Sequence, residues 1–94
     1  RPDMLEKFDL EKALASTIEE MRLATNAQIQ YTCTTELNGF NDDEEEIIYR
    51  IVQESITNSI RHGKASSIDI WIDRQFNMLK IKLQDNGIAC KDIQ

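Results

Sequence analysis

The sequence is poor in the residues that build disulfide-rich, zinc-binding and membrane-spanning proteins. Its two cysteines, Cys33 and Cys90, form no CxxC pair, and with a single histidine beside them neither a disulfide framework nor a zinc site is expected. No apolar run reaches the roughly 18 residues that indicate a transmembrane helix, and the first residues lack the apolar core of a signal peptide. We therefore expect a cytoplasmic domain, whether or not the rest of its protein is anchored in a membrane.

Positive charge is also scarce. The chain has 11 Lys and Arg against 17 Asp and Glu, which gives a net charge of −6. Such a chain is a poor candidate for binding nucleic acid, because that requires cations to displace the phosphate counterions. The acidic residues concentrate in the run DDEEE at 42–46. Carboxylates favour the positive end of a helix dipole, so this run predicts a helix start with Asp42 or Asp43 as the N-cap.

What remains is an ordinary composition for one domain, with 94 residues of which 40% are hydrophobic. Apolar residues recur at helical spacing after Asp9, a natural N-cap, to about residue 24. They recur again from residue 43 to about His62, where Gly63 stands in the position of a left-handed C-terminal cap. Two amphipathic helices are therefore predicted.

Three segments alternate between apolar and polar side chains, at 28–37, 67–73 and 78–85. Each predicts a strand with one apolar face, and the short link between the last two predicts an antiparallel hairpin. One sheet with both helices on one face satisfies all the apolar faces most simply. The sequence therefore predicts an α+β fold, a two-layer sandwich that looks unfinished at its C-terminus. Because the chain starts at Arg1 rather than Met, we expect it to be a piece of a longer protein.

The second helix carries polar side chains beside its apolar face. On a helical wheel with about 100° per residue and Ile47 at zero, Asn58 falls near 20°, between Ile47 and Ile51. Glu54 and Arg61 fall just outside, at about 340° and 320°. Asn58 is thus predicted to lie along the edge of the buried face, with Glu54 one turn before it.

A polar group at that edge needs partners, since burying it unpaired costs about 1–3 kcal/mol. One explanation is structural, with Asn58 bonded to nearby backbone and Glu54 paired with Arg50 or Arg61. The other is a hydrated Mg²⁺ held by the oxygens of Asn58 and Glu54, with Arg61 on a phosphate. The wheel alone leaves both explanations open.

The end of the last predicted strand also has a structural explanation and a ligand-binding explanation. Asp85 continues the inward phase of Leu83, although inward carboxylates are uncommon because desolvating a charge is costly. Asn86 and Gly87 follow, and an Asp-Asn-Gly turn that ends the strand is one explanation. A carboxylate that accepts a hydrogen bond from the amino group of adenine is the other.

Together the two patterns resemble the ATP-binding domain of sensor histidine kinases, which has the Bergerat or GHKL fold with helices on one face of a mixed sheet. The resemblance rests on ExxxNxxRHGxA at 54–65 and on the hairpin that ends in DNG. YRIVQESITNSIRHGKASSIDIWI and LKIKLQDNGIA look like the branch that partners LuxR-type response regulators, and RPDMLEKFDLEKAL is similar to the segment that follows the dimerisation helices there. The resemblance covers nearly the whole chain. It implies a linker at 1–9 and a partial catalytic core at 10–94.

The resemblance also assigns roles to the residues of the second helix. It implies that Asn58 is a Mg²⁺ ligand and that Glu54 takes the acidic position where related gyrase and chaperone ATPases place the residue that activates water. Glu54 is therefore the candidate catalytic residue, and in a kinase it is expected to orient the waters of the metal. Arg61 matches the basic position near the nucleotide phosphates. His62 lies beside it, where a packed structural histidine is the alternative.

At the strand end, the resemblance assigns Asp85 to the adenine amino group and Gly87 to the first glycine of the glycine box. The second glycine is replaced by Ala89, whose Cβ would hinder a positive φ and could crowd the nucleotide. The chain also stops at Gln94, before the ATP lid and the last strands of the family are expected. No phosphoacceptor histidine motif is present, so we expect this piece alone to be inactive.

The implied activity is that of a protein histidine kinase with ATP and Mg²⁺ as its cofactors. The γ-phosphate would pass to a histidine on the dimerisation domain of the same protein, and then to an aspartate of a LuxR-type response regulator. Two nearer alternatives share the fold, a hydrolytic ATPase and a serine kinase that inhibits a sigma factor. A further alternative is a noncatalytic interaction module, in which exposed sheet edges form a homodimer, for example by exchanging strands.

Overall fold

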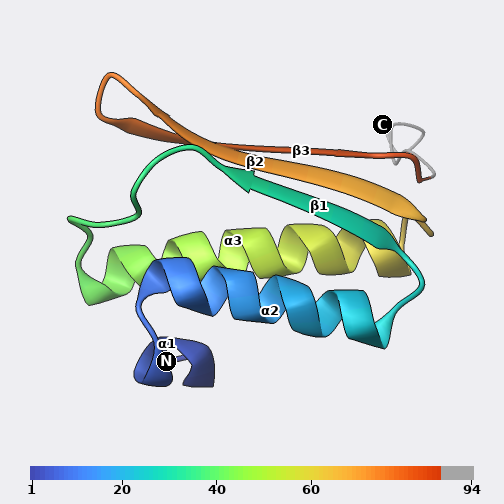
Figure 1. Cartoon of the computed structure of the whole chain (residues 1–94), viewed down its shortest axis with the longest axis horizontal. Helices are drawn as coiled ribbons and strands as arrows, with labels where there is room; N and C mark the ends of the chain where they lie inside the picture. The colour runs from blue at the N-terminus through green and yellow to red at the C-terminus, as the bar shows by residue number, and fades with distance from the viewer. Residues whose placement is uncertain (88–94) are drawn as a thin grey trace.

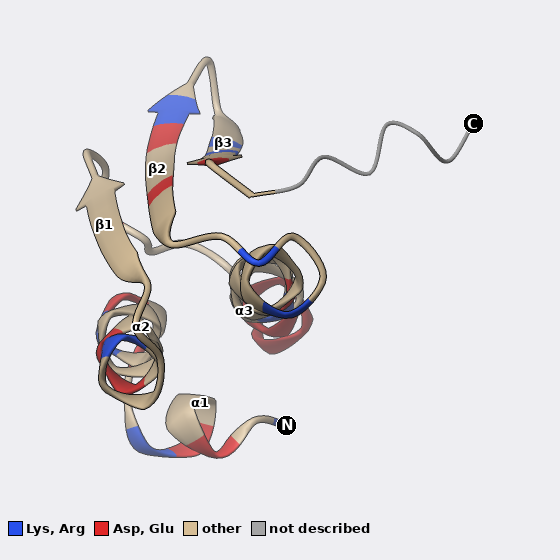
Figure 2. Ribbon diagram, turned by 90° about the vertical axis from the view of Figure 1, so that its right-hand side faces the viewer, with Lys and Arg blue, Asp and Glu red and all other residues tan. Residues whose placement is uncertain are grey.

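The computed structural model describes residues 1–87, which form a layer of helices against one face of a three-stranded sheet (Figure 1). The elements in chain order are α1 (Asp3–Lys7), α2 (Leu10–Ala24), β1 (Gln28–Cys33), α3 (Asp42–Arg61), β2 (Ser67–Gln75) and β3 (Met78–Asp85). Helices α2 and α3 lie side by side under the sheet, and α1 lies on their far side (Figures 1 and 2). The predicted α+β sandwich is confirmed. No helix of residues 1–87 is both long enough and apolar enough to cross a membrane.

The sheet has the order β1-β2-β3 and is mixed, because β1 runs parallel to β2 while β3 runs antiparallel to it. The parallel pair is joined through α3, and the antiparallel pair is the predicted hairpin. Its turn contains only Phe76 and Asn77, whose φ angles of 50° and 65° are both positive. Two positive φ angles in succession are the mark of a type I′ turn, whose twist matches that of the strands.

The core lies between the central strand and the two long helices. Its largest fully buried side chains come from α2, α3 and β2, and they are Leu10, Leu14, Ile18, Val52, Ile56, Ile68, Ile70 and Ile72. Tyr49 of α3 brings its hydroxyl into this core, where it hydrogen-bonds to the hydroxyl of Thr17 on α2. The two helices are therefore joined to each other as well as to the sheet.

The helix ends differ in part from the prediction. Asp9 caps α2 as predicted, since its Oδ1 accepts from the Lys12 amide at 2.9 Å. The prediction of Asp42 or Asp43 as the cap of α3 is wrong, because Asn41 is the N-cap. Asn41 Oδ1 accepts from the Glu44 amide at 2.8 Å, and Glu44 Oε1 accepts from the Asn41 amide at 2.9 Å. This reciprocal pair is a capping box, and it places the acidic run in the first turn.

The left-handed cap predicted at Gly63 is also wrong. His62 is the C-cap of α3, with φ −98° and ψ −37°, and the left-handed residue is Lys64, with φ 53°. Gly63 is buried at the end of the helix.

The first residues pack onto the domain through α1, a helix that the sequence did not predict. Leu5 of this helix is buried in the common core. The Arg1 guanidinium donates to the Asp42 carbonyl at 2.9 Å and to Glu45 Oε1 at 2.8 Å, both in the first turn of α3. The start of the chain is therefore tied to the start of α3.

Candidate functional site

The predicted site residues come from the second half of α3 and from the end of β3, and the fold brings these two regions together. The Ser59 hydroxyl on α3 donates to Asp85 Oδ2 at 2.5 Å, across 26 positions of sequence. Asp85 therefore points toward the helix layer, as the strand alternation predicted. The Asp85 residue is nevertheless exposed rather than buried, so part of its carboxylate remains open to a ligand.

The Asp-Asn-Gly segment is held in place by polar contacts on both sides. Asp85 Oδ1 accepts from the Gly87 amide at 2.9 Å, which closes a tight turn. Asn86 Oδ1 accepts from the amides of Ser66 and Ser67, each at 3.0 Å, and Asn86 Nδ2 donates to Ser66 Oγ at 3.0 Å. The segment is thus a strand-ending turn, and it fixes the loop between α3 and β2 against the end of β3.

Gly87 is required by a close approach of two backbones. A Cβ added there would lie 2.4 Å from the carbonyl oxygen of Gly63 and 2.8 Å from its carbonyl carbon. Real Cβ contacts essentially never come so close. The end of β3 can therefore lie against the end of α3 only because this residue lacks a side chain.

Glu54, Asn58 and Arg61 lie four and three positions apart on α3 and share one edge of the helix, where all three are exposed. The prediction that this edge borders a buried Ile47 and Ile51 is wrong, since those side chains are 58% and 45% exposed. The reason is the arrangement of neighbours. Helix α2 covers one flank of α3 and the sheet covers its top (Figure 2), but no element within residues 1–87 covers the other flank.

The polar side chains of this edge have no structural partners within residues 1–87. Arg50 pairs with Glu46 at 3.1 Å rather than with Glu54. In the same part of the chain, neither Glu54 nor Arg61 forms a salt bridge, and the Asn58 side chain forms no hydrogen bond. The structural explanation of the pattern is therefore absent from the described residues.

The donor atoms fit a hydrated Mg²⁺. Asn58 and Glu54 supply oxygen atoms one helical turn apart, and Mg²⁺ takes one or two such ligands while it keeps waters and phosphate oxygens. No cluster of three or more His, Cys, Asp and Glu side chains occurs in the described part of the chain. The residues therefore suit an ion shared with a phosphate ligand better than an ion held by protein alone.

Charge along α3 also favours a phosphate at this end. Four acidic residues lie in the first turn and Glu54 lies in the second half of the helix, while Arg61 lies in the last turn and Lys64 follows it (Figure 2). Asp43 and Arg61 are about 27 Å apart along the axis at 1.5 Å per residue. That distance exceeds the Debye length of about 8 Å at physiological salt, so the acidic turn has little influence on an anion near Arg61.

His62 and Ala89 complete the set of predicted site residues. His62 is exposed at the helix end, so it is not a packed core histidine, and its amide donates to the Asn58 carbonyl at 2.9 Å. Ala89 lies outside the described residues. Ser59 was missed by the sequence analysis, although a small polar residue on the buried face directly after Asn58 was a readable signal.

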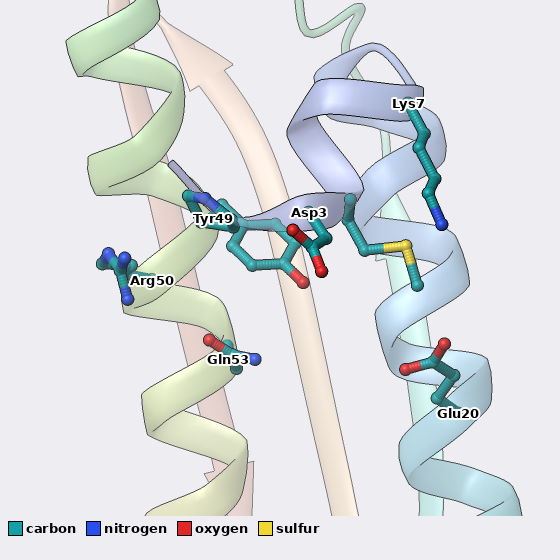
Figure 3. Close-up of a pocket in the computed structure, with 8 residues that line it drawn as sticks. Asp3, Lys7, Glu20, Tyr49, Arg50 and Gln53 are labelled. Carbon is teal, nitrogen blue, oxygen red and sulfur yellow. The ribbon is translucent and has the colours of Figure 1, made fainter.

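A separate hollow of about 440 Å³ lies between α1, α2 and α3, on the side of the helices away from the sheet (Figure 3). Its lining includes Asp3, Glu20, Tyr49 and Gln53. None of the predicted site residues lines it, so it is distinct from the site formed by α3 and β3.

Comparison of the sequence with known proteins identifies a family and two similar proteins. Residues 43–93 match the family described as histidine kinase-, DNA gyrase B- and HSP90-like ATPases. Over 91 residues, 97% of this chain, it is 30% identical to the sensor histidine kinase LiaS of Bacillus subtilis (strain 168). Over the same length it is 21% identical to the oxygen sensor histidine kinase NreB of Staphylococcus carnosus (strain TM300).

The aligned region makes up 25% of the first relative and 26% of the second, so the chain spans about a quarter of the length of these proteins. The family match covers more than half of the chain and contains α3 from its second residue, the hairpin and every predicted site residue. The chain belongs to the family of histidine kinase-, DNA gyrase B- and HSP90-like ATPases, and its relatives are sensor histidine kinases.

Proposed function

We propose that this chain is the ATP- and Mg²⁺-binding portion of a cytoplasmic sensor histidine kinase domain. The observation that carries the proposal is the hydrogen bond between Ser59 and Asp85. It places an exposed carboxylate, suited to the amino group of adenine, beside the turn of α3 that bears Asn58. The base and the metal would then bind at the same end of one helix.

Each residue has a definite task in this proposal. Asp85 accepts from the adenine amino group, and Gly87 lets the backbone lie close beneath the base. Asn58 and Glu54 hold Mg²⁺ and orient its waters. Arg61, with His62 beside it, offsets the charge of the phosphates.

The proposed domain boundaries follow the same comparison with kinases. Residues 1–9 are a linker that packs on the domain through α1, and residues 10–94 are part of the catalytic core. Ala89 stands where the second glycine of the glycine box is expected.

The proposed reaction transfers the γ-phosphate of ATP to a histidine on the dimerisation domain of the same protein, and then to an aspartate of a LuxR-type response regulator. Bound Mg²⁺ would supply charge neutralisation at the phosphates. The residues of this chain act by positioning, because phosphoryl transfer leaves the protein little covalent chemistry to perform. Asp85 fixes the base, Asn58 and Glu54 fix the metal, and Arg61 balances the negative charge. The names of the two relatives favour a kinase over a hydrolytic ATPase of the same fold.

A second candidate is a noncatalytic interaction module, which is favoured by the apolar flank of α3. Exposed Ile47 and Ile51 border an open hollow of about 260 Å³ that Leu79 and Ile81 of β3 also line. A second copy of the chain could cover this flank or pair with the edge of β3. Sedimentation equilibrium tests this candidate: a dimer that Ile51→Lys dissociates would support it, and a wild-type monomer would contradict it.

Calorimetric titration of Mg²⁺-ADP into the chain tests the nucleotide proposal. We expect binding that Asp85→Asn weakens at least about tenfold, which corresponds to ~1.4 kcal/mol. Asp69→Asn is the matched control, because Asp69 lies between the buried Ile68 and Ile70 and points to the other face of the sheet. Unchanged affinity in Asp85→Asn would show that the base does not bind at this carboxylate.

A further inference from the structure

Ser59 is a buried hydroxyl in a region where the proposed ligands are exposed. The residue is 7% exposed, and its Oγ lies 2.5 Å from Asp85 Oδ2. A hydroxyl that donates to a carboxylate at such a distance makes a strong, charge-assisted hydrogen bond. The backbone around Ser59 is also fixed, because its carbonyl accepts from the Ala65 amide at 2.9 Å.

The Asp85 carboxylate is held at both oxygens. Ser59 binds Oδ2 from α3, and the Gly87 amide binds Oδ1 at 2.9 Å from the following turn. Two donors from different elements fix the plane of the carboxylate, and each oxygen keeps a lone pair for a further donor. Without Ser59, only the contact within its own turn would remain, and the terminal torsion of an aspartate is otherwise broad.

We propose that Ser59 is a positioning residue that makes the site select adenine over bases with a carbonyl at the same position. The inference rests on the proposed function, in which Asp85 receives the adenine amino group. An ionised carboxylate only accepts hydrogen bonds, so a base carbonyl facing it leaves two acceptors opposed. A carboxylate held by Ser59 cannot turn away from that carbonyl, so the repulsion between the two acceptors is not relieved. A carboxylate freed from Ser59 can rotate, and the mismatch is relieved.

The test compares the affinities of Mg²⁺-ADP and Mg²⁺-inosine diphosphate. Adenine carries an amino group beside an unprotonated N1, whereas hypoxanthine carries a carbonyl beside a protonated N1. We expect the wild-type chain to prefer ADP and Ser59→Ala to lose about tenfold of this preference, the effect of one hydrogen bond to a charged group. Ser59→Thr keeps the hydroxyl and should keep the preference. Ser55→Ala makes the same change one turn earlier on α3 and should leave the ratio of affinities unchanged.

Circular dichroism identifies the variants that fold, and Ser59→Cys replaces Ser59→Ala if the latter does not, since a thiol is a much weaker donor. The inference is overturned if Asp85→Asn weakens ADP binding but Ser59→Ala leaves the ADP to inosine diphosphate ratio unchanged; the proposed function then stands. If Asp85→Asn does not weaken ADP binding, or if the wild-type chain binds no ADP, the proposed function fails and the inference fails with it.

Discussion

At the scale of single residues, the site depends on small groups in close contact rather than on a cluster of charges. Ser59 and Asp85 join α3 to β3, and Gly87 lets the two backbones meet at Gly63. Sequence alternation was enough to predict that Asp85 points inward. It could not predict the Ser59 contact, because that contact depends on how far along β3 the end of α3 lies.

Gly87→Ala is expected to destabilise the chain and to weaken ADP binding. The added Cβ would meet the Gly63 carbonyl at 2.4 Å, so the turn or the helix end must shift. Overpacking of this kind costs about 1–3 kcal/mol, which urea unfolding would measure. Gly39→Ala is the comparison, because nothing lies within 4 Å of its added Cβ and only its φ of +82° is strained. That variant should lose stability without losing ADP affinity, and wild-type behaviour in Gly87→Ala would contradict the close approach.

Two tyrosines should respond in opposite ways to loss of the hydroxyl. Tyr49 shares a hydrogen bond with Thr17 in the core, so Tyr49→Phe should cost about 1 kcal/mol. The buried hydroxyl of Tyr31 has no hydrogen-bond partner within residues 1–87, so Tyr31→Phe should cost nothing or should stabilise the fold. Free energies of unfolding in urea would compare the two. A larger loss in Tyr31→Phe than in Tyr49→Phe would contradict this account of the core.

The buried phenol of Tyr31 should also make the free energy of unfolding depend on pH. Burial, and then the neighbouring Cys33 thiol, raise the pKa of the Tyr31 phenol well above its ordinary range. The unfolded chain loses this proton near pH 10 while the folded chain keeps it, so ionisation of Tyr31 leaves the stability unchanged below about pH 10 and lowers it as the pH rises further. Tyr31→Phe should therefore flatten the fall in unfolding free energy above pH 10. An equal slope in the variant and the wild type would exclude a raised pKa.

At the scale of elements, sequence periodicity predicts the long helices and the strands. The structure differs from the prediction at the ends of these elements. The acidic run at 42–46 predicted a helix start, but the cap is Asn41, because its extended backbone lets its side chain reach the Glu44 amide. Helix α1 has only five residues, too few for periodicity to reveal, and it is held by burial of Leu5 and by the contacts of Arg1.

The capping box gives a prediction at this scale. Asn41→Ala removes the acceptor for the Glu44 amide and should destabilise the chain by about 1 kcal/mol. Thermal unfolding followed by circular dichroism would measure the change. Asn38→Ala, in the exposed loop before the helix, is the control and should change stability by less than about 0.5 kcal/mol. Equal effects of the two substitutions would mean that the capping box does not stabilise α3.

At the scale of the whole molecule, the fold places both halves of the candidate site at one end of α3. Strand β2 pairs in parallel with β1 and lies in the centre of the sheet. The hairpin then places β3 at the edge of the sheet that lies nearer to α3 (Figure 2). A helical wheel shows which residues share a face, but it does not show which neighbour covers that face. For that reason the wheel placed Ile47 and Ile51 in the core, whereas they lie on the open flank of α3.

The central claim is that an adenine nucleotide binds between the Asn58 edge of α3 and the end of β3. Titration of Mg²⁺-ADP into the ¹⁵N-labelled chain, followed through backbone amide shifts, tests it most directly. The account predicts that the largest changes occur at Asn58, Ser59, Arg61 and residues 85–87. Changes centred on the hollow between α1, α2 and α3, at Met4, Glu20 and Gln53, would contradict it (Figure 3).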